Sequence, residues 1–150
     1  MEEENIEIEF LILADFAEVV GNKLYMMGGG WDRMNVQKLP HRQSFSVAAA
    51  ISVPWAHTNE RNAIKIVITD EDGMQELVSI DGGFEVGRAA RIKPGTRQRL
   101  MMGFTVGSME FKTAGVFSII SSVDGEEKRR IQFHVAPSPQ LEAQIKGKPA

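Results

Sequence analysis

The sequence predicts an all-β protein, an antiparallel β-sandwich of about eight strands with an immunoglobulin-like arrangement. Apolar residues recur at every second position along most of the 150-residue chain, which is typical of strands with one buried face. The tight-turn pairs Gly21-Asn22 and Asp124-Gly125 interrupt the alternation and favour hairpins. Helical periodicity is nearly absent. We therefore expect a single sandwich domain over residues 1–137 and a weakly ordered tail over residues 138–150.

The composition limits the compartment and the class of partner. The chain is 43% hydrophobic and 25% charged, as expected for one globular domain with one core. Its formal net charge of -3 disfavours nucleic-acid binding, which normally needs a basic surface. The absence of cysteine excludes disulfides and thiolate metal sites. The start, MEEEN, lacks the basic residues of a secretory signal, and no apolar run reaches the ~20 residues of a membrane helix. We expect a cytoplasmic protein with no membrane partner.

The first hairpin is predicted between residues 10 and 31, around Gly21 and Asn22, which both tolerate positive φ. Alternate apolar residues would share one face of its first strand: Ile6, Ile8, Phe10, Ile12, Ala14 and Phe16. Leu11 and Leu13 then lie on the opposite face. A strand that is apolar on both faces is covered on both, so we regard Leu11 and Leu13 as candidate interface residues.

Three successive glycines, Gly28 to Gly30, precede Trp31 and Asp32. Glycine weakens a strand, so its use here needs a backbone reason. A β-bulge or a close crossing of two sheets is the favoured interpretation. The alternative is a backbone cradle for an anion, although the Lys-Ser/Thr of a phosphate loop is missing. Trp31 is expected to pack across the bulge as a core aromatic, and Trp31 and Asp32 are also binding candidates.

A later strand, from Phe45 to Val53, has one face made of small residues: Ser46, Ala48, Ala50 and Ser52. Such a stripe lets another backbone approach closely, either a loop of the same chain or a partner subunit. Ala48 and Ala50 therefore join Leu11 and Leu13 as predicted interface residues.

The longest irregular connection is predicted over residues 54–62, around Trp55 and His57. Binding groups concentrate on loops that a rigid scaffold holds in place, so these two residues are binding candidates. The alternative is that Trp55 covers one end of the core and that His57 is solvated.

Two charged segments follow. The tetrad Asp70-Glu71-Asp72-Gly73 predicts a hairpin turn and is also a candidate calcium half-site. A basic cluster surrounds Pro94-Gly95 and consists of Arg88, Arg91, Lys93, Arg97 and Arg99. Such a cluster is able to steer an anionic ligand or an acidic partner, which makes Arg88 a binding candidate. A solvated loop is the alternative, because no aromatic residue is interleaved for base stacking.

The last third has the clearest β pattern. Alternate apolar positions between 100 and 123 predict two strands, and Ile131, Phe133 and Val135 return on the same inner face after the Asp124-Gly125 turn. The stretch AGVFSIISSVDGEEKRRIQFHV resembles the closing hairpin of many immunoglobulin-like sandwiches.

Several short motifs occur together from about residue 10 to residue 135: ADFAEV, NKLYMMGGGWDRM, VPW, DEDG, FEVGR, PGT and VDGEE. In this combination the chain resembles a family of short bacterial proteins that is catalogued as a domain of unknown function. The resemblance implies a single small β domain in bacteria. It implies no activity, cofactor or catalytic residue.

The sequence contains no residue set that indicates a reaction. The histidines, His41, His57 and His134, lie in separate segments without metal-ligand spacing, and no nucleophile or zinc-protease motif is present. We therefore predict a protein that is not an enzyme, with no catalytic residue, metal site or cofactor. The leading hypothesis is a binding or assembly module that contacts another protein or a second copy of itself. The alternative is a small-ligand or calcium-binding domain that uses its end loops.

Overall fold

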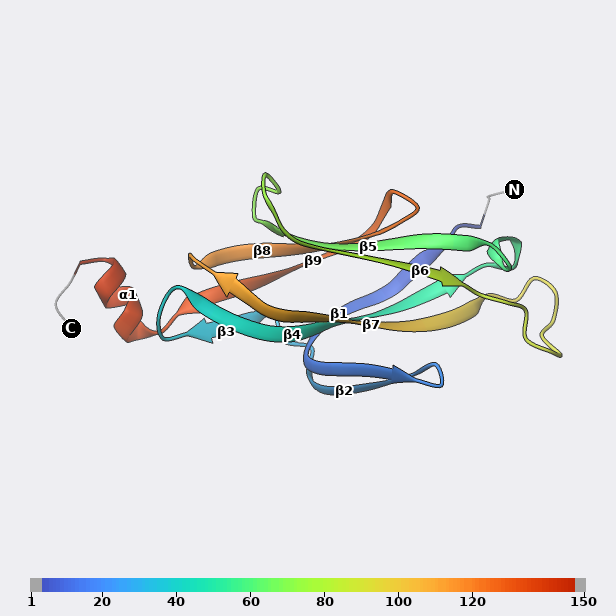
Figure 1. Cartoon of the computed structure of the whole chain (residues 1–150), viewed down its shortest axis with the longest axis horizontal. Helices are drawn as coiled ribbons and strands as arrows, with labels where there is room; N and C mark the ends of the chain where they lie inside the picture. Colours follow the sequence, from blue (N-terminus) through green and yellow to red (C-terminus); the bar gives the residue numbers. More distant parts are fainter. Residues whose placement is uncertain (1–3, 148–150) are drawn as a thin grey trace.

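The computed structural model of the chain describes residues 4–147, which are mostly β-strand (Figure 1). Nine strands, one 3-10 turn and one helix follow in this order: β1 Glu7–Val20, β2 Lys23–Gly29, β3 Arg33–Val36, β4 His41–Val53, η1 Trp55–His57, β5 Arg61–Asp70, β6 Glu76–Glu85, β7 Gln98–Phe111, β8 Gly115–Val123, β9 Glu126–Pro137 and α1 Pro139–Ile145.

The strands form two sheets. One has the order β2-β1-β4-β7 and the other has the order β3-β9-β8-β5-β6. All pairs are antiparallel except β3 with β9, which is parallel. The strand that raises the number from the expected eight to nine is β3. It is only four residues long, and it exists because Arg33–Val36 pairs with residues about a hundred positions away, which local alternation does not reveal.

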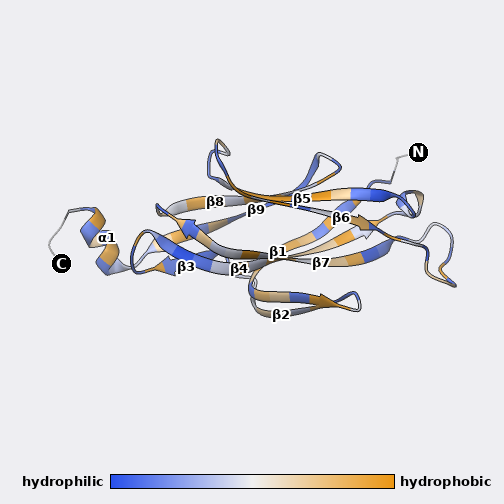
Figure 2. Cartoon of the chain, in the orientation of Figure 1, coloured by the Kyte–Doolittle hydropathy of each residue, from blue (hydrophilic) through white to orange (hydrophobic). Residues whose placement is uncertain are grey.

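The core lies between the two sheets. Orange and blue segments alternate along the strands in Figure 2, as the period of two requires. Phe45 and Phe111 from one sheet meet Phe117 and Phe133 from the other, with ring centroids 6.0 Å apart for Phe45 and Phe133 and 5.2 Å apart for Phe111 and Phe117. Trp31 adds an edge contact to Phe45 at 6.0 Å. Trp31 is partly buried and packs against this core, which agrees with the packing role that the sequence predicts for it.

A β-bulge in β1 corrects the expected faces of that strand. The register with β4 shifts between Ile8 and Phe10. Ile8 faces the core before the shift, and Leu11 and Leu13 face it afterwards, because an extra residue reverses the alternation. Leu11 and Leu13 are thus buried between the sheets, and the surface interface that the sequence suggested for them does not exist at these positions.

The second half of β1 leaves the sheet and folds back with β2 across its outer face (Figure 1). Ala17 of this hairpin packs with Ala14 and Ala48, and Leu24 packs against them. A Cβ atom on Gly103 of β7 would lie 3.6 Å from the carbonyl oxygen of Ala17, so the two backbones are close. At Ala48 the small-residue stripe is therefore covered by the chain's own hairpin, the first of its two predicted options. Ala48 and Ala50 are fully buried and are not available to a partner subunit.

The predicted weakly ordered tail contains the short helix α1. The Ser138 hydroxyl accepts a hydrogen bond from the Leu141 amide, and Pro139 stands in the first turn, two features that favour a helix start. Leu141 is buried against the core, so this helix packs onto the sandwich. Residues 148–150 of the predicted tail lie outside the described residues.

Candidate functional site

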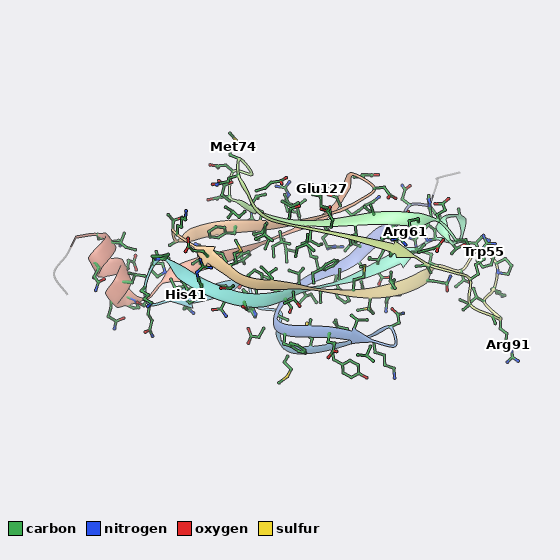
Figure 3. All side chains as sticks on the ribbon, viewed as in Figure 1. His41, Trp55, Arg61, Met74, Arg91 and Glu127 are labelled. Carbon is green, nitrogen blue, oxygen red and sulfur yellow. The ribbon has the colours of Figure 1, made fainter. Side chains whose placement is uncertain are left out.

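Exposed large apolar side chains gather on the β1–β2 hairpin. Phe16 is 50% exposed, Val20 and Tyr25 are each 54% exposed, and Met27 is 70% exposed. These four residues are called the hairpin face below. Several side chains of this hairpin project away from the rest of the molecule (Figure 3). Large apolar side chains that lie together on a surface mark interaction sites more often than scattered ones do.

The register of the hairpin builds this face. Phe16 pairs with Met27, and Val20 pairs with Lys23. The turn residues Gly21 and Asn22 both have φ of 58°, which matches the type I′ turn expected from the sequence. Because alternate residues share a face, every second residue from Phe16 onward points outward. Glu18 and Tyr25, which pair with each other, lie on the same outward side.

The tip of the hairpin is fastened to the far edge of the sheet. Asn22 Nδ2 donates to the carbonyl oxygen of Arg99, and Asn22 Oδ1 accepts from the amide of Met101, both at 2.8 Å. Arg99 also forms an ion pair with Glu9 at 2.6 Å, and this hydrogen-bonded carboxylate raises the pKa of Arg99 above its ordinary value. The hairpin is therefore held at its base by packing and at its tip by hydrogen bonds.

The glycine run serves the backbone of the hairpin. Gly28 and Gly30 have φ of 61° and 89°, a region that favours glycine. A Cβ atom on Gly28 would collide with the carboxylate of Asp15. The absent side chain of Gly28 thus leaves room for Asp15, and this disfavours the anion cradle, because a carboxylate at this position repels an anion.

The five predicted binding residues separate into two groups. Trp31 and Asp32 lie beside β3 and β9, where the Asp32 carbonyl oxygen accepts from the amide of His134 at 2.8 Å. Trp55 lies beyond the other end of β4, opposite the end that carries His41 (Figure 3). Trp31 packs against Phe45. The chain advances ten positions from Phe45 to Trp55, which corresponds to roughly 30 Å in an extended strand. The two groups do not form one site.

Trp31 lines a small pocket, together with Asp15, Arg33, Met34 and Gln43, with a volume of about 220 Å³. Its ring nitrogen Nε1 is buried and finds no hydrogen-bond partner among the described residues. The Trp31 ring packs in T-shaped arrangements with the rings of Phe45 and Phe133, at centroid distances of 6.0 and 6.2 Å. The contacts of Trp31 are thus those of a packing residue.

Trp55 and Arg88 are brought together at the other end. The guanidinium carbon of Arg88 lies 3.8 Å from the ring centroid of Trp55. Arg88 Nε donates to the hydroxyl of Thr58 at 2.7 Å. His57 Nδ1 lies 3.0 Å from a carboxylate oxygen of Glu60. Arg88 is therefore bound by its own chain rather than presented to an anion.

Two further charged candidates, Arg97 and Asp70, are also bound by groups of the chain. Arg97 donates to the hydroxyl of Ser52 and to the carbonyl oxygen of Asn5, each at 2.7 Å. A carboxylate oxygen of Asp70 accepts from the amides of Met74 and Gln75 at 3.0 and 3.4 Å, which is turn chemistry. Within residues 4–147, no group of three or more His, Cys, Asp or Glu side chains is arranged to hold a metal ion.

The hairpin face was missed by the sequence analysis. The alternation alone puts Phe16 on the same face as Ile8 and Ile12, and it marks Tyr25 and Met27 only as residues of the partner strand. A usable signal exists in hindsight, because the Gly21-Asn22 turn puts all four apolar residues on one side of the hairpin. In the described part of the chain, no helix is long and apolar enough to cross a membrane.

Two solved structures show limited similarity to the chain. The Pseudomonas fluorescens alkylpurine DNA glycosylase AlkC, bound to DNA containing an abasic site analog, matches 87% of this chain with 30% of its own length, at 11% identity and a TM-score of 0.41. The β-glucosidase from Listeria innocua in complex with glucose matches 88% of this chain with 16% of its own length, at 8% identity and a TM-score of 0.44. The chain spans less than a third of either protein.

A comparison with curated proteins found no match. The model of a family of unknown function, DUF6941, matches residues 9–136. This range covers β2 to β8 entirely and nearly all of β1 and β9, so the chain belongs to the DUF6941 family.

Proposed function

We propose that this protein is a non-enzymatic binding or assembly module that acts through contacts with another protein or with a second copy of itself. The observation that carries the proposal is the hairpin face, whose four side chains are each at least half exposed. At about 150–250 Å² for an aromatic side chain, the face offers apolar area on the order of a few hundred Å². The largest apolar patch of a typical folded domain is of this size, and it is often functional.

The rigidity of the hairpin supports the proposal. Ala17 and Leu24 pack inward, and Asn22 is bonded to β7. The outward residues are therefore held in place before a partner arrives. A preformed surface loses less conformational entropy on binding than a surface that must first become ordered. Glu18 and Lys23 lie next to the apolar residues and supply the polar rim that protein interfaces normally have.

The proposed setting is a bacterial cytoplasm, and the proposed architecture is immunoglobulin-like. The absence of cysteine is consistent with a reducing compartment. One sheet contains the order β6-β5-β8-β9, and the other contains the order β1-β4-β7. This supports the immunoglobulin-like assignment, because that fold also places its closing hairpin beside a strand from the middle of the chain in one sheet, and its first strands in the other sheet.

The test compares the wild-type chain with the double variant F16S/M27S. Light scattering over a concentration series measures molar mass, with the chain alone and with proteins that co-purify with it from its host. We expect complexes above the chain mass of 16.6 kDa for the wild type. The variant should bind about a hundredfold more weakly, because each large apolar side chain contributes about 1.5–3 kcal/mol on burial.

The matched control is M74S/L77S, which removes two exposed apolar residues from the β5–β6 turn and from β6. This control should associate as the wild type does, and all variants should keep the same melting temperature. Association that survives in F16S/M27S, or that the control loses equally, contradicts the proposal.

A further inference from the structure

We propose that the open edge of β2 pairs in antiparallel fashion with β2 of a second copy of the chain, about a two-fold axis beside Tyr25. The inference rests on the proposed function and names one partner for it. It uses a different part of the hairpin, the backbone edge rather than the outward side chains.

The four edge strands of the described residues differ in protection. An unpaired strand edge attracts other strands, and folded proteins block such edges with charges, bulges or short length. The edge of β7 is bonded to side chains in two places, at Arg99 and Met101 by Asn22 and at Ser108 by Arg42 and Ser44. The strand β6 contains Glu76, Asp81 and Glu85, and β3 has only four residues.

The central part of β2 has none of these protecting features. Lys23 is its one charged residue, and the stretch Leu24 to Met27 contains neither charge nor proline. Within residues 4–147, only β1 pairs with it. The unpaired parts of β1 and β9 are blocked in other ways: Arg129 Nε donates to the carbonyl oxygen of Ile8 at 2.9 Å, and β9 begins with five charged residues in succession. The edge of β2 is thus the most open one.

The turn decides which backbone groups of β2 face outward. In a two-residue type I′ hairpin, the flanking pair, here Val20 and Lys23, exchanges both backbone hydrogen bonds. Alternate residues of a strand bond to the same side, so Tyr25 and Met27 direct their peptide groups to β1. Leu24 and Met26 direct theirs to the open edge, where a second strand can bond to them.

A second β2 is complementary to this edge. With the axis beside Tyr25, Leu24 of one copy exchanges backbone hydrogen bonds with Met26 of the other, and the same pair repeats on the other side of the axis. Tyr25 then faces Tyr25 of the second copy, and Met27 faces Lys23. No two like charges oppose each other in this register, and both Tyr25 and Met27, which are more than half exposed, gain a neighbour.

The paired strands are short, so the dimer should be weak. Interfaces well below the standard ~1,600 Å² are typical of transient association. We therefore expect a dimer with a dissociation constant on the order of micromolar to hundreds of micromolar.

The chain has no cysteine, so a single introduced cysteine reports proximity to a second copy without background. We expect Y25C to form a disulfide dimer in a glutathione buffer, because facing Cα atoms of a non-hydrogen-bonded pair are about 4.5 Å apart, within the range of a disulfide. M27C alone should stay monomeric, since two such residues would be about 14 Å apart along the strands. A mixture of K23C and M27C should give the mixed dimer.

The control for random collision is M74C, because Met74 lies on a turn and is 85% exposed. Y25C dimers that form no faster than those of M74C overturn the inference. So does M27C crosslinking as readily as Y25C, because that result places the strands in another register.

A second variant pair tests the backbone directly. M26P removes the outward amide of Met26, whereas M26A removes only the side chain. At several hundred micromolar, light scattering should show a monomer for M26P and a dimer for M26A, and a dimeric M26P overturns the inference. If Y25C stays monomeric while F16S/M27S abolishes binding to another protein, the self-pairing falls and the proposed function stands. If F16S/M27S changes nothing, the proposed function falls as well.

Discussion

Arg88 shows how one side chain organises one end of this molecule. Its guanidinium group lies over the ring of Trp55, while Nε and Nη2 donate to the Thr58 hydroxyl and to the Trp55 carbonyl oxygen at 2.7 and 3.3 Å. Only a planar group with several donors can stack and bond in this way. The loop between β6 and β7 is thereby joined to η1, although thirty residues separate Arg88 from Thr58.

The variant R88A should lower the free energy of unfolding by about 1–2 kcal/mol, because it removes a cation–π contact and a hydrogen bond to a buried threonine. R88K should recover only part of this loss, since an ammonium group cannot both stack and bond to Thr58. Urea unfolding followed by tryptophan fluorescence measures both. K93A, which changes an exposed residue of the same loop, is the control. Equal stability of R88K and the wild type would show that charge alone matters.

At the scale of elements, the β1–β2 hairpin is the distinctive part of the fold. It is continuous with the sheet through β1, yet it lies over the outer face of the same sheet and buries Ala48 (Figure 1). Its inner side is fastened to the sheet, and its outer side and open edge carry the two proposed contacts. The hairpin therefore holds both proposed contact surfaces in place. The hydrogen bonds of Asn22 to β7 can be tested directly.

The variant N22G should keep the turn, because glycine adopts the φ of 58° that Asn22 has. It removes both hydrogen bonds to β7, and we expect a loss of about 1–2 kcal/mol in the free energy of unfolding. The amide of Met101 should exchange faster with solvent, as measured by hydrogen exchange. N22D, which keeps the acceptor for this amide, should leave it protected. A Met101 amide that exchanges at the wild-type rate in N22G contradicts the attachment.

At the scale of the whole molecule, two sheets share one core, and the bulge in β1 decides which residues belong to it. Leu13 is 2% exposed and Phe16, three residues later on the same strand, is 50% exposed. The same strand thus serves the core with its first half and the surface with its second half. The consequence is a sharp contrast between substitutions that are close in sequence.

The variant L13D should unfold the protein, because burial of an unpaired carboxylate costs several kcal/mol and a typical domain has only about 5–15 kcal/mol to lose. F16D should remain folded, since its side chain projects to solvent. Circular dichroism and thermal melting distinguish the two. A folded L13D with reduced self-association would instead place Leu13 at an interface and contradict the core described above.

The sequence by itself determined the all-β class, the Gly21-Asn22 and Asp124-Gly125 turns and the core position of Trp31, because alternation, turn preference and aromatic burial are local properties of the chain. Only the tertiary structure decided that Leu11 and Leu13 face the core, that the hairpin covers Ala48, and that Phe16 and Met27 remain exposed. A period of two says which residues share a face but not which face is buried, and a single bulge exchanges the two. Two other features also depend on long-range packing that no local pattern encodes. They are the cation–π contact between Trp55 and Arg88 and the pairing of Arg33–Val36 with β9.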